Sequence, residues 1–226
     1  MLKGTVSILF ILVSCLWAAP KVAKVSYVEG KAFLFVKESK KKIKIGLVLK
    51  QGYTLKTESN SRLEITYLNG DVVRLDQNSE ITLEGQPDKG KPKLQKGKLW
   101  NNIKKLAKGN PDFKVSTNVA TAAVRGTIFQ VEASDSTASV HLFDGKVDVG
   151  PNKAPERDTN SWGPPAEISG PAEVSMTTWV SLDPGQMINV NWDGSYKADK
   201  FKEDDLDQAW LKFNQKRDAE LTKQKR

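Results

Sequence analysis

At 226 residues, with 38% hydrophobic and 27% charged residues, the chain is long enough for one good-sized core or two small ones. Thirty-five Lys and Arg against 27 Asp and Glu leave a net charge of +8, which favours anionic partners without choosing among lipid headgroups, acidic glycans and nucleic acid. One cysteine excludes an intrachain disulfide, and one histidine excludes any site built on two histidines.

The N-terminus has the pattern of an export signal, because Lys3 precedes an apolar run, Thr5 to Val13, that is too short to span a bilayer comfortably. Two endings compete. Leu12-Val13-Ser14-Cys15 resembles a lipobox, which would make Cys15 an acylated N-terminus after removal of residues 1–14. Alternatively, signal peptidase I cleaves after Ala18, within an export segment of residues 1–19. Both endings place the mature chain outside the cytoplasm.

The next segments alternate in hydrophobicity, as half-buried strands do. Two strands are expected between Val25 and Val36, and further strands at 52–57, 61–68, 72–75 and 81–83. Asn69-Gly70 is a strong hairpin signal. The basic turn at 37–44 includes Lys40, Lys41 and Lys42, which either contact an anion or protect a strand edge from aggregation.

A polar Gly/Pro loop is expected at Gly85 to Lys93. A short internal helix should follow it, because Trp100, Ile103, Leu106 and Ala107 fall at helical spacing ahead of Gly109.

The stretch from Val115 to Gly150 is the clearest β segment. Its second half alternates, and Asp144-Gly145 between two alternating runs predicts a type I′ hairpin. In its first half, Arg125-Gly126-Thr127 interrupts a run of small residues, and the glycine predicts a tight bend or a close backbone approach.

Three turns share the order hydrophobic, Asx, Gly, polar, with their glycines at Gly70, Gly145 and Gly194. This loose repetition is typical of a β-solenoid-like or two-sheet β domain. Residues 151–173 are a proline-rich irregular segment, and residues 174–198 return as strands that complete the domain.

The last segment, 203–226, predicts an amphipathic helix with a basic tail. One face of this helix carries Leu206, Trp210, Phe213, Arg217 and Leu221. The predicted fold class is therefore mainly β, with a short internal helix and a C-terminal amphipathic helix.

The segment from Ala122 to Val131, Ala-Ala-Val-Arg-Gly-Thr-x-Phe-x-Val, resembles the signature of FecR-type domains of the bacterial envelope, and the resemblance extends over roughly 46–149. It implies a FecR-like β domain over 22–150, with Arg125, Gly126, Thr127 and Phe129 as family-motif residues. Arg125 either grips a carboxylate or phosphate through its guanidinium fork or satisfies turn carbonyls inside the β core; we expect the structural role for the motif.

Regulatory FecR proteins transmit an outer-membrane signal to a cytoplasmic anti-sigma segment that precedes a membrane span. Here only four residues precede the apolar run, so the resemblance implies a free-standing exported domain. We expect a non-enzymatic binding or scaffolding module in the periplasm, lipid-anchored if Cys15 is acylated. The alternative is a periplasmic component of FecR-type signal transduction coupled to an outer-membrane receptor.

No catalytic motif, phosphate loop, dinucleotide fingerprint or Cys/His metal spacing occurs in the sequence, so we expect no catalytic residues, metal or cofactor. The expected partner is an envelope protein or an anionic glycan or lipid surface. Nucleic acid is not expected, and membrane contact is expected only through a lipid anchor at Cys15.

Overall fold

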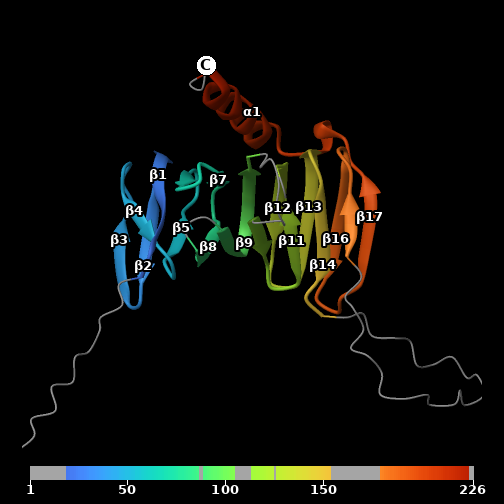
Figure 1. The fold of residues 1–226 in the computed structure, drawn as a ribbon, viewed down its shortest axis with the longest axis horizontal. Coiled ribbons are helices and arrows are strands. Elements are labelled where there is room, and N and C mark those ends of the chain that lie inside the picture. Colours follow the sequence, from blue (N-terminus) through green and yellow to red (C-terminus); the bar gives the residue numbers. More distant parts are fainter. Residues whose placement is uncertain (1–18, 87–88, 105–112, 125, 154–178, 224–226) are drawn as a thin grey trace, which may run out of the picture.

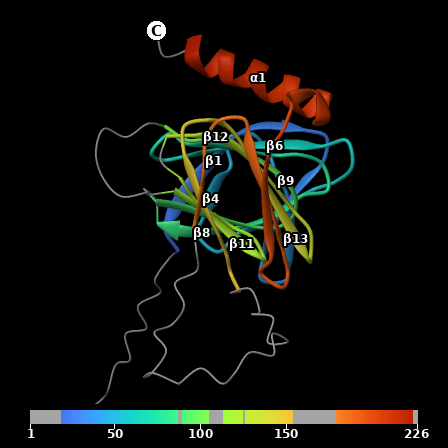
Figure 2. The ribbon, with the colours of Figure 1, turned by 90° about the vertical axis from the view of Figure 1, so that its right-hand side faces the viewer.

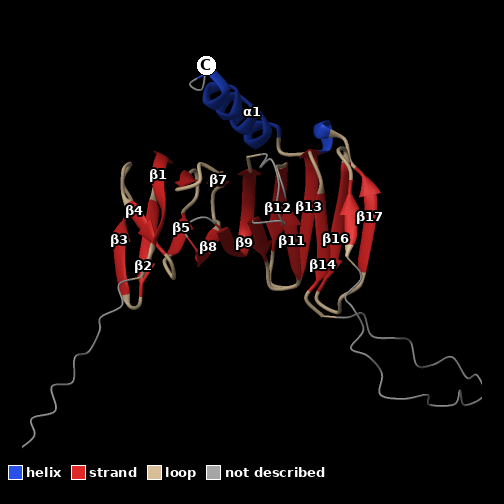
Figure 3. Ribbon diagram, viewed as in Figure 1, coloured by secondary structure: helices blue, strands red, loops and turns tan. Residues whose placement is uncertain are grey.

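The computed structural model describes residues 19–86, 89–104, 113–124, 126–153 and 179–223. Seventeen strands, one short 3-10 helix and one α-helix make the described chain mainly β, as predicted. The strands form two layers, sheet A and sheet B, which the chain visits alternately (Figures 1 and 3). The prediction left a solenoid-like and a two-sheet domain open, and the strands form the two-sheet arrangement.

Sheet A is antiparallel throughout, and its strands follow one another across the molecule in an order that differs from their order in the chain. In spatial order they are β4 (Val48–Lys50), β1 (Lys21–Glu29), β6 (Arg62–Tyr67), β7 (Val72–Leu75), the end of β9 (Lys89–Asn102), β12 (Ile128–Ala133), β13 (Thr137–Asp144), β16 (Gln186–Asn191) and β17 (Tyr196–Lys200).

Sheet B extends between the same two ends of the molecule as sheet A does. Its order is β3 (Ser39–Lys42), β2 (Ala32–Val36), β5 (Thr54–Thr57), β8 (Glu80–Gln86), the start of β9, β10 (Phe113–Ser116), β11 (Ala120–Val124), β14 (Val147–Pro151) and β15 (Val180–Leu182). β9 joins the sheets, because its first half pairs with β8 and its second half with β7 and β12. Gly97, with φ of 95°, lies where β9 changes sheets.

The hydrophobic core lies between the two sheets and follows from the alternation of the strands. In sheet B every second residue of a strand enters it, as Leu55, Ile81 and Leu83 do, and sheet A contributes residues such as Leu99 and Phe129. The alternate residues point away from the core, so each sheet also has an outer face.

The C-terminal helix α1 (Gln208–Lys223) covers the outer face of sheet A (Figure 2). The 3-10 helix η1 (Glu203–Asp205) precedes it. The predicted helix at 203–226 is therefore present, but it begins later, at Gln208. None of the described helices is long and apolar enough to cross a membrane.

Two local predictions before residue 105 are wrong. Trp100 lies in strand β9 and not in a helix, because Leu99 and Trp100 alternate between the core and the underside of α1. Residues 105–107 of that predicted helix lie outside the described residues. The predicted loop at Gly85 to Lys93 is largely a hairpin of β8 and β9, in which Leu83 pairs with Pro92.

The predicted hairpin at Asp144-Gly145 is also wrong. β13 and β14 on its two sides belong to different sheets, so the turn is a corner between layers. Gly145 has φ of 90°, and a Cβ there would lie 2.6 Å from the carbonyl oxygen of Gly126. The turn needs glycine because the corner at Gly145 touches the corner at Gly126.

The turns at Gly70 and Gly194 do close hairpins, β6–β7 and β16–β17. Their glycines have φ of 84° and 85°, and each donates its N–H to the carbonyl three residues earlier. Only the glycine has a positive φ, which is typical of a type I turn ending in a G1 bulge rather than of type I′.

Candidate functional site

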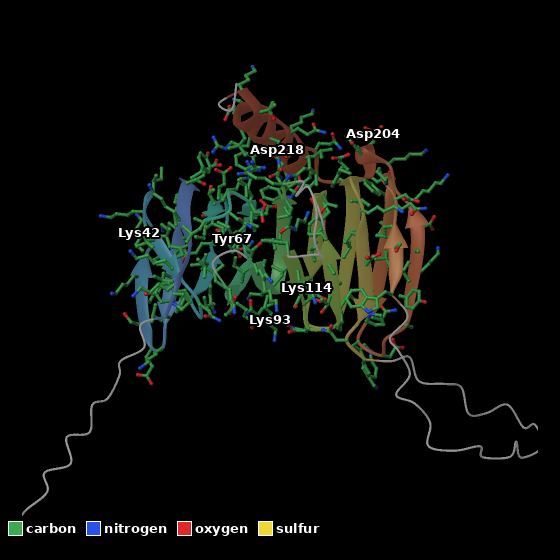
Figure 4. The ribbon with its side chains drawn as sticks, in the orientation of Figure 1. Lys42, Tyr67, Lys93, Lys114, Asp204 and Asp218 are labelled. Atoms are coloured by element: carbon green, nitrogen blue, oxygen red, sulfur yellow. The ribbon has the colours of Figure 1, made fainter. Side chains whose placement is uncertain are left out.

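The outer face of sheet B is rich in lysine. Cross-strand partners share a face, so the register of the strands identifies the side chains that point away from the core. The outward lysines, which we call the lysine face, are Lys40, Lys42, Lys56, Lys89, Lys91, Lys93, Lys96 and Lys114. The outward acids on the same strands are Glu80, Glu84 and Asp148. No described helix covers this face, and Lys93 and Lys114 lie on the side opposite Asp218 of α1 (Figure 4).

A groove of about 410 Å³ opens on this face near β3. Its apolar wall is formed by Phe33 and Phe35, two residues apart on β2 and both half-buried. The charged wall is formed by Lys40, Lys56, Glu58, Glu80 and Lys96.

Lysine and phenylalanine interleave at the mouth of this groove. The Lys40 amine lies 3.8 Å from the centroid of the Phe33 ring, and the Lys56 amine lies 4.9 Å from that of Phe35. Lys56 also pairs with Glu80 at 2.9 Å, whereas Lys40 takes part in none of the ion pairs between described residues. The groove therefore offers an apolar ring surface beside a cation that is available to an anion.

The rim of the groove is fixed by two turns, at 58–61 and 76–79. The hydroxyl of Thr57 donates to the carbonyl of Asp76 at 2.5 Å and accepts the N–H of Ser79 at 3.0 Å. Asn60 and Asn78 hold φ of 51° and 53°, a conformation that asparagine tolerates better than most residues. This bonding gives the groove a preformed rim.

Of the residues singled out from the sequence, Lys40 lines this groove, whereas Gly126, Thr127 and Phe129 do not. Cys15 and Arg125 lie outside the described residues. Gly126 has φ of 63° at the corner that touches Gly145, Thr127 is buried there, and Phe129 is fully buried in the core. The structural role of the motif remains a prediction for Arg125.

Phe33, Phe35 and Lys56 were missed as site residues. The available signal was alternation: Phe33 and Phe35 share a face, which cannot be the face of Ala32 and Leu34. Cross-strand partners could not be assigned, because β2 pairs with both β3 and the more distant β5.

Among the described residues, no three His, Cys, Asp or Glu side chains are grouped so that they could hold a metal ion. The groove thus presents charge and an apolar wall. Its chemistry is suited to holding a ligand in place.

The family model of the FecR protein matches residues 53–148, from the turn before β5 to the middle of β14. Over these residues the chain is similar to a FecR domain. Phe33, Phe35 and Lys40 precede the FecR match, while Lys56, Glu80 and Lys96 lie within it, so the groove straddles the start of the matched region.

The fold is similar to that of a solved protein from Parabacteroides distasonis ATCC 8503 described as a "putative anti-sigma factor". The match has 20% sequence identity and a TM-score of 0.51, and it covers 70% of this chain and 64% of that chain. A second crystal structure under the same description, also at 20% identity, gives a TM-score of 0.48 and covers 65% and 59% of the two chains. At this identity the likeness concerns the fold alone. No curated protein matches this chain.

Proposed function

We propose that this chain is an exported, non-enzymatic FecR-domain protein of the bacterial envelope, and that its lysine face binds an anionic partner. The observation that carries the proposal is the uncovered lysine face with its groove of two phenylalanines beside Lys40. Clustered positive charge attracts anions, and the ring faces offer an apolar surface to a ligand that is both polar and flat.

An acidic saccharide fits this chemistry best. Its carboxylates can pair with Lys40 and Lys96, while the apolar face of a sugar ring packs on Phe33. The preformed rim lowers the cost of ordering the groove on binding.

The test is calorimetric titration of the full chain with oligogalacturonate and with an uncharged oligosaccharide of equal length. Binding of the acidic ligand alone is expected, and Lys40→Gln with Lys56→Gln should weaken it at least tenfold. Lys197→Gln is the matched control, because Lys197 lies on β17 of sheet A. Equal binding of both saccharides, or an effect of Lys197→Gln as large as that of the groove variants, would contradict the proposal. Vesicles of phosphatidylglycerol form a separate arm, and binding to them alone would assign the face to lipid.

A second candidate is a component of FecR-type signal transduction coupled to an outer-membrane receptor. The FecR match at 53–148 favours it, as does the fold likeness to the Parabacteroides distasonis protein. Deleting the gene in its native host should then abolish an inducible transcriptional response. An unchanged transcriptome under every inducing condition would remove this candidate.

A further inference from the structure

The lysine face has an order along the groove that its total charge does not describe. Five adjacent strands of sheet B, β3, β2, β5, β8 and β9, each contribute one outward side chain to a single row of cross-strand partners. The row, which we call the charged row, is Lys42, Phe33, Lys56, Glu80 and Lys96. All five are at least partly exposed, and all except Lys42, at the end of the molecule formed by β3, line the groove (Figure 4).

The charged row runs across the strands, so its spacing is that of the sheet. Neighbouring strands lie about 4.8 Å apart, which separates the backbone positions of Lys56 and Lys96 by about 10 Å. One pyranose unit of a linear saccharide is similar in length to one strand spacing. A saccharide chain that lies along the row therefore places one unit over each strand and presents its units to the row in order.

Two cations flank one carboxylate in the half of the row that lies on β5, β8 and β9. The Lys56 amine binds Oε1 of Glu80 at 2.9 Å, whereas Lys96 takes part in none of the ion pairs between described residues. The side chain of Glu80 is 19% exposed, so a ligand in the groove can reach it. A unit over β5 or β9 therefore meets a lysine, and the unit between them meets Glu80.

Glu80 discriminates between acidic and neutral units over β8. A carboxylate on that unit would lie against the carboxylate of Glu80, and like charges that are brought together at an interface suppress binding. A hydroxyl or amide N–H on the same unit donates to Glu80 instead, because an ionised carboxylate only accepts hydrogen bonds. The position over β8 is therefore suited to a neutral unit.

The position over β2 also suits a neutral unit. Phe33 contributes a half-buried apolar ring there, next to Lys56 on one side and Lys42 on the other. The only cation near this ring among the described residues is Lys40, whose amine lies 3.8 Å from the ring centroid. Lysine has a flexible stem, so Lys40 can move to the edge of the ring when a sugar packs on it.

We propose that the charged row recognises a linear saccharide in which acidic units alternate with neutral ones, and that Glu80 determines this specificity. Acidic units lie over Lys42, Lys56 and Lys96, and neutral units lie over Phe33 and Glu80. The proposal rests on the binding of an acidic saccharide to the lysine face and adds the order of the units. Charge alone predicts the opposite preference, for the saccharide with a carboxylate on every unit.

Titration of the full chain with two acidic hexasaccharides tests the proposal. The hyaluronan hexasaccharide alternates glucuronate with neutral N-acetylglucosamine, whereas hexagalacturonate is acidic at every unit. The hyaluronan hexasaccharide should bind at least about fivefold more tightly, although it has half as many carboxylates. Glu80→Gln should abolish this preference, because hexagalacturonate binds more tightly once the repulsion over β8 is gone. Loss of a partly exposed ion pair leaves the fold intact.

Glu84→Gln is the matched control. Glu84 is an exposed outward acid on the same strand, but it pairs with Lys91 outside the charged row. The change in net charge is the same, so both ligands should gain equally and the ratio of their affinities should stay unchanged. A change in this ratio as large as that caused by Glu80→Gln would overturn the role of Glu80.

An uncharged hexasaccharide, cellohexaose, separates failure of this proposal from failure of the proposed function. If both acidic hexasaccharides bind equally, or hexagalacturonate binds more tightly, while cellohexaose does not bind, the alternation is wrong and an acidic saccharide remains the ligand. If neither acidic hexasaccharide binds, the proposed function and this proposal both fail.

Discussion

The two outer faces of the sandwich are built alike and end in opposite environments. On sheet A, one row of cross-strand partners, Glu64, Arg74, Trp100, Gln130 and His141, is almost wholly buried. On sheet B, an equivalent row of cross-strand partners runs from Lys42 through Phe33 and Lys56 to Lys96, and every member is at least partly exposed. Both rows mix charges with aromatic rings. The difference is the C-terminal segment 201–223, so burial on these faces depends on what covers them and not on residue type.

An ion pair therefore contributes differently to stability on the two faces. Lys56 and Glu80 pair at 2.9 Å with side chains 40% and 19% exposed, and such a pair contributes about 0–1 kcal/mol. Arg74 and Glu64 pair at 2.6 Å with side chains 0% and 1% exposed. Losing one partner there leaves a charge buried without compensation.

The largest expected effect follows from this contrast. Arg74→Ala should lower the free energy of unfolding by about 3–5 kcal/mol, because Asp218 loses its buried cation and Glu64 loses one of two. Lys56→Ala should cost no more than about 1 kcal/mol. Urea denaturation of both variants measures the difference. If the two variants lost equal free energy of unfolding, cover by α1 would not make the ion pairs on the two faces differ in strength.

Acid should weaken the covered face first. Burial lowers the pKa of His141 to about 4, with a smaller contribution from Lys98, so the ring is neutral in the folded chain. The unfolded state takes up a proton below pH 6.5 that the folded state refuses, so stability falls between about pH 6.5 and 4. At about 1.4 kcal/mol per pKa unit the loss is on the order of 3 kcal/mol. His141→Gln should flatten the stability profile in this window, and an unchanged slope would contradict the assignment.

The sequence predicted the layers better than the connections between them. Alternation located most strands, and Asn69-Gly70 correctly predicted a hairpin. Asp144-Gly145 carries the same signal but marks a corner, because a glycine with positive φ suits both turns. Trp100 has helical spacing with Ile103, yet it lies in a strand. β9 pairs with β7 on one side and β12 on the other, and this long-range pairing overrides the local periodicity.

Gly97 lies where β9 passes from sheet B to sheet A, and its replacement should cause the next largest loss of stability. With φ of 95°, its added Cβ would lie 2.6 Å from Cα of Ser79. Gly97→Ala should cost about 2–3 kcal/mol through strain and collision. Gly52→Ala is the matched control: its φ is 83° with nothing within 4 Å of a Cβ, so strain alone should cost about 1 kcal/mol. Thermal unfolding compares the two, and equal losses would show that the collision relaxes freely.

The sites were harder to predict than the fold. The lysines at 40–42 suggested an anion contact or a protected edge, and the structure places Lys40 at a groove while Lys41 faces away from it. Glu64 and Asp218 are 154 positions apart in the chain, and Arg74 pairs with both of them. No pattern in one sequence identifies such a network, because the position of α1 over sheet A depends on packing between distant segments.

The smallest effect on stability is expected on the uncovered face. Lys42→Glu reverses a charge at an exposed edge-strand position, so the free energy of unfolding should change by less than about 0.5 kcal/mol. Binding of oligogalacturonate should nevertheless weaken, because the ligand meets a less positive face, and the weakening should shrink in high salt as charges are screened. Lys197→Glu, on β17, should leave both quantities unchanged. If Lys42→Glu destabilised the chain as much as Arg74→Ala does, the face of sheet B would be covered in solution, and the contrast between the two faces would be lost.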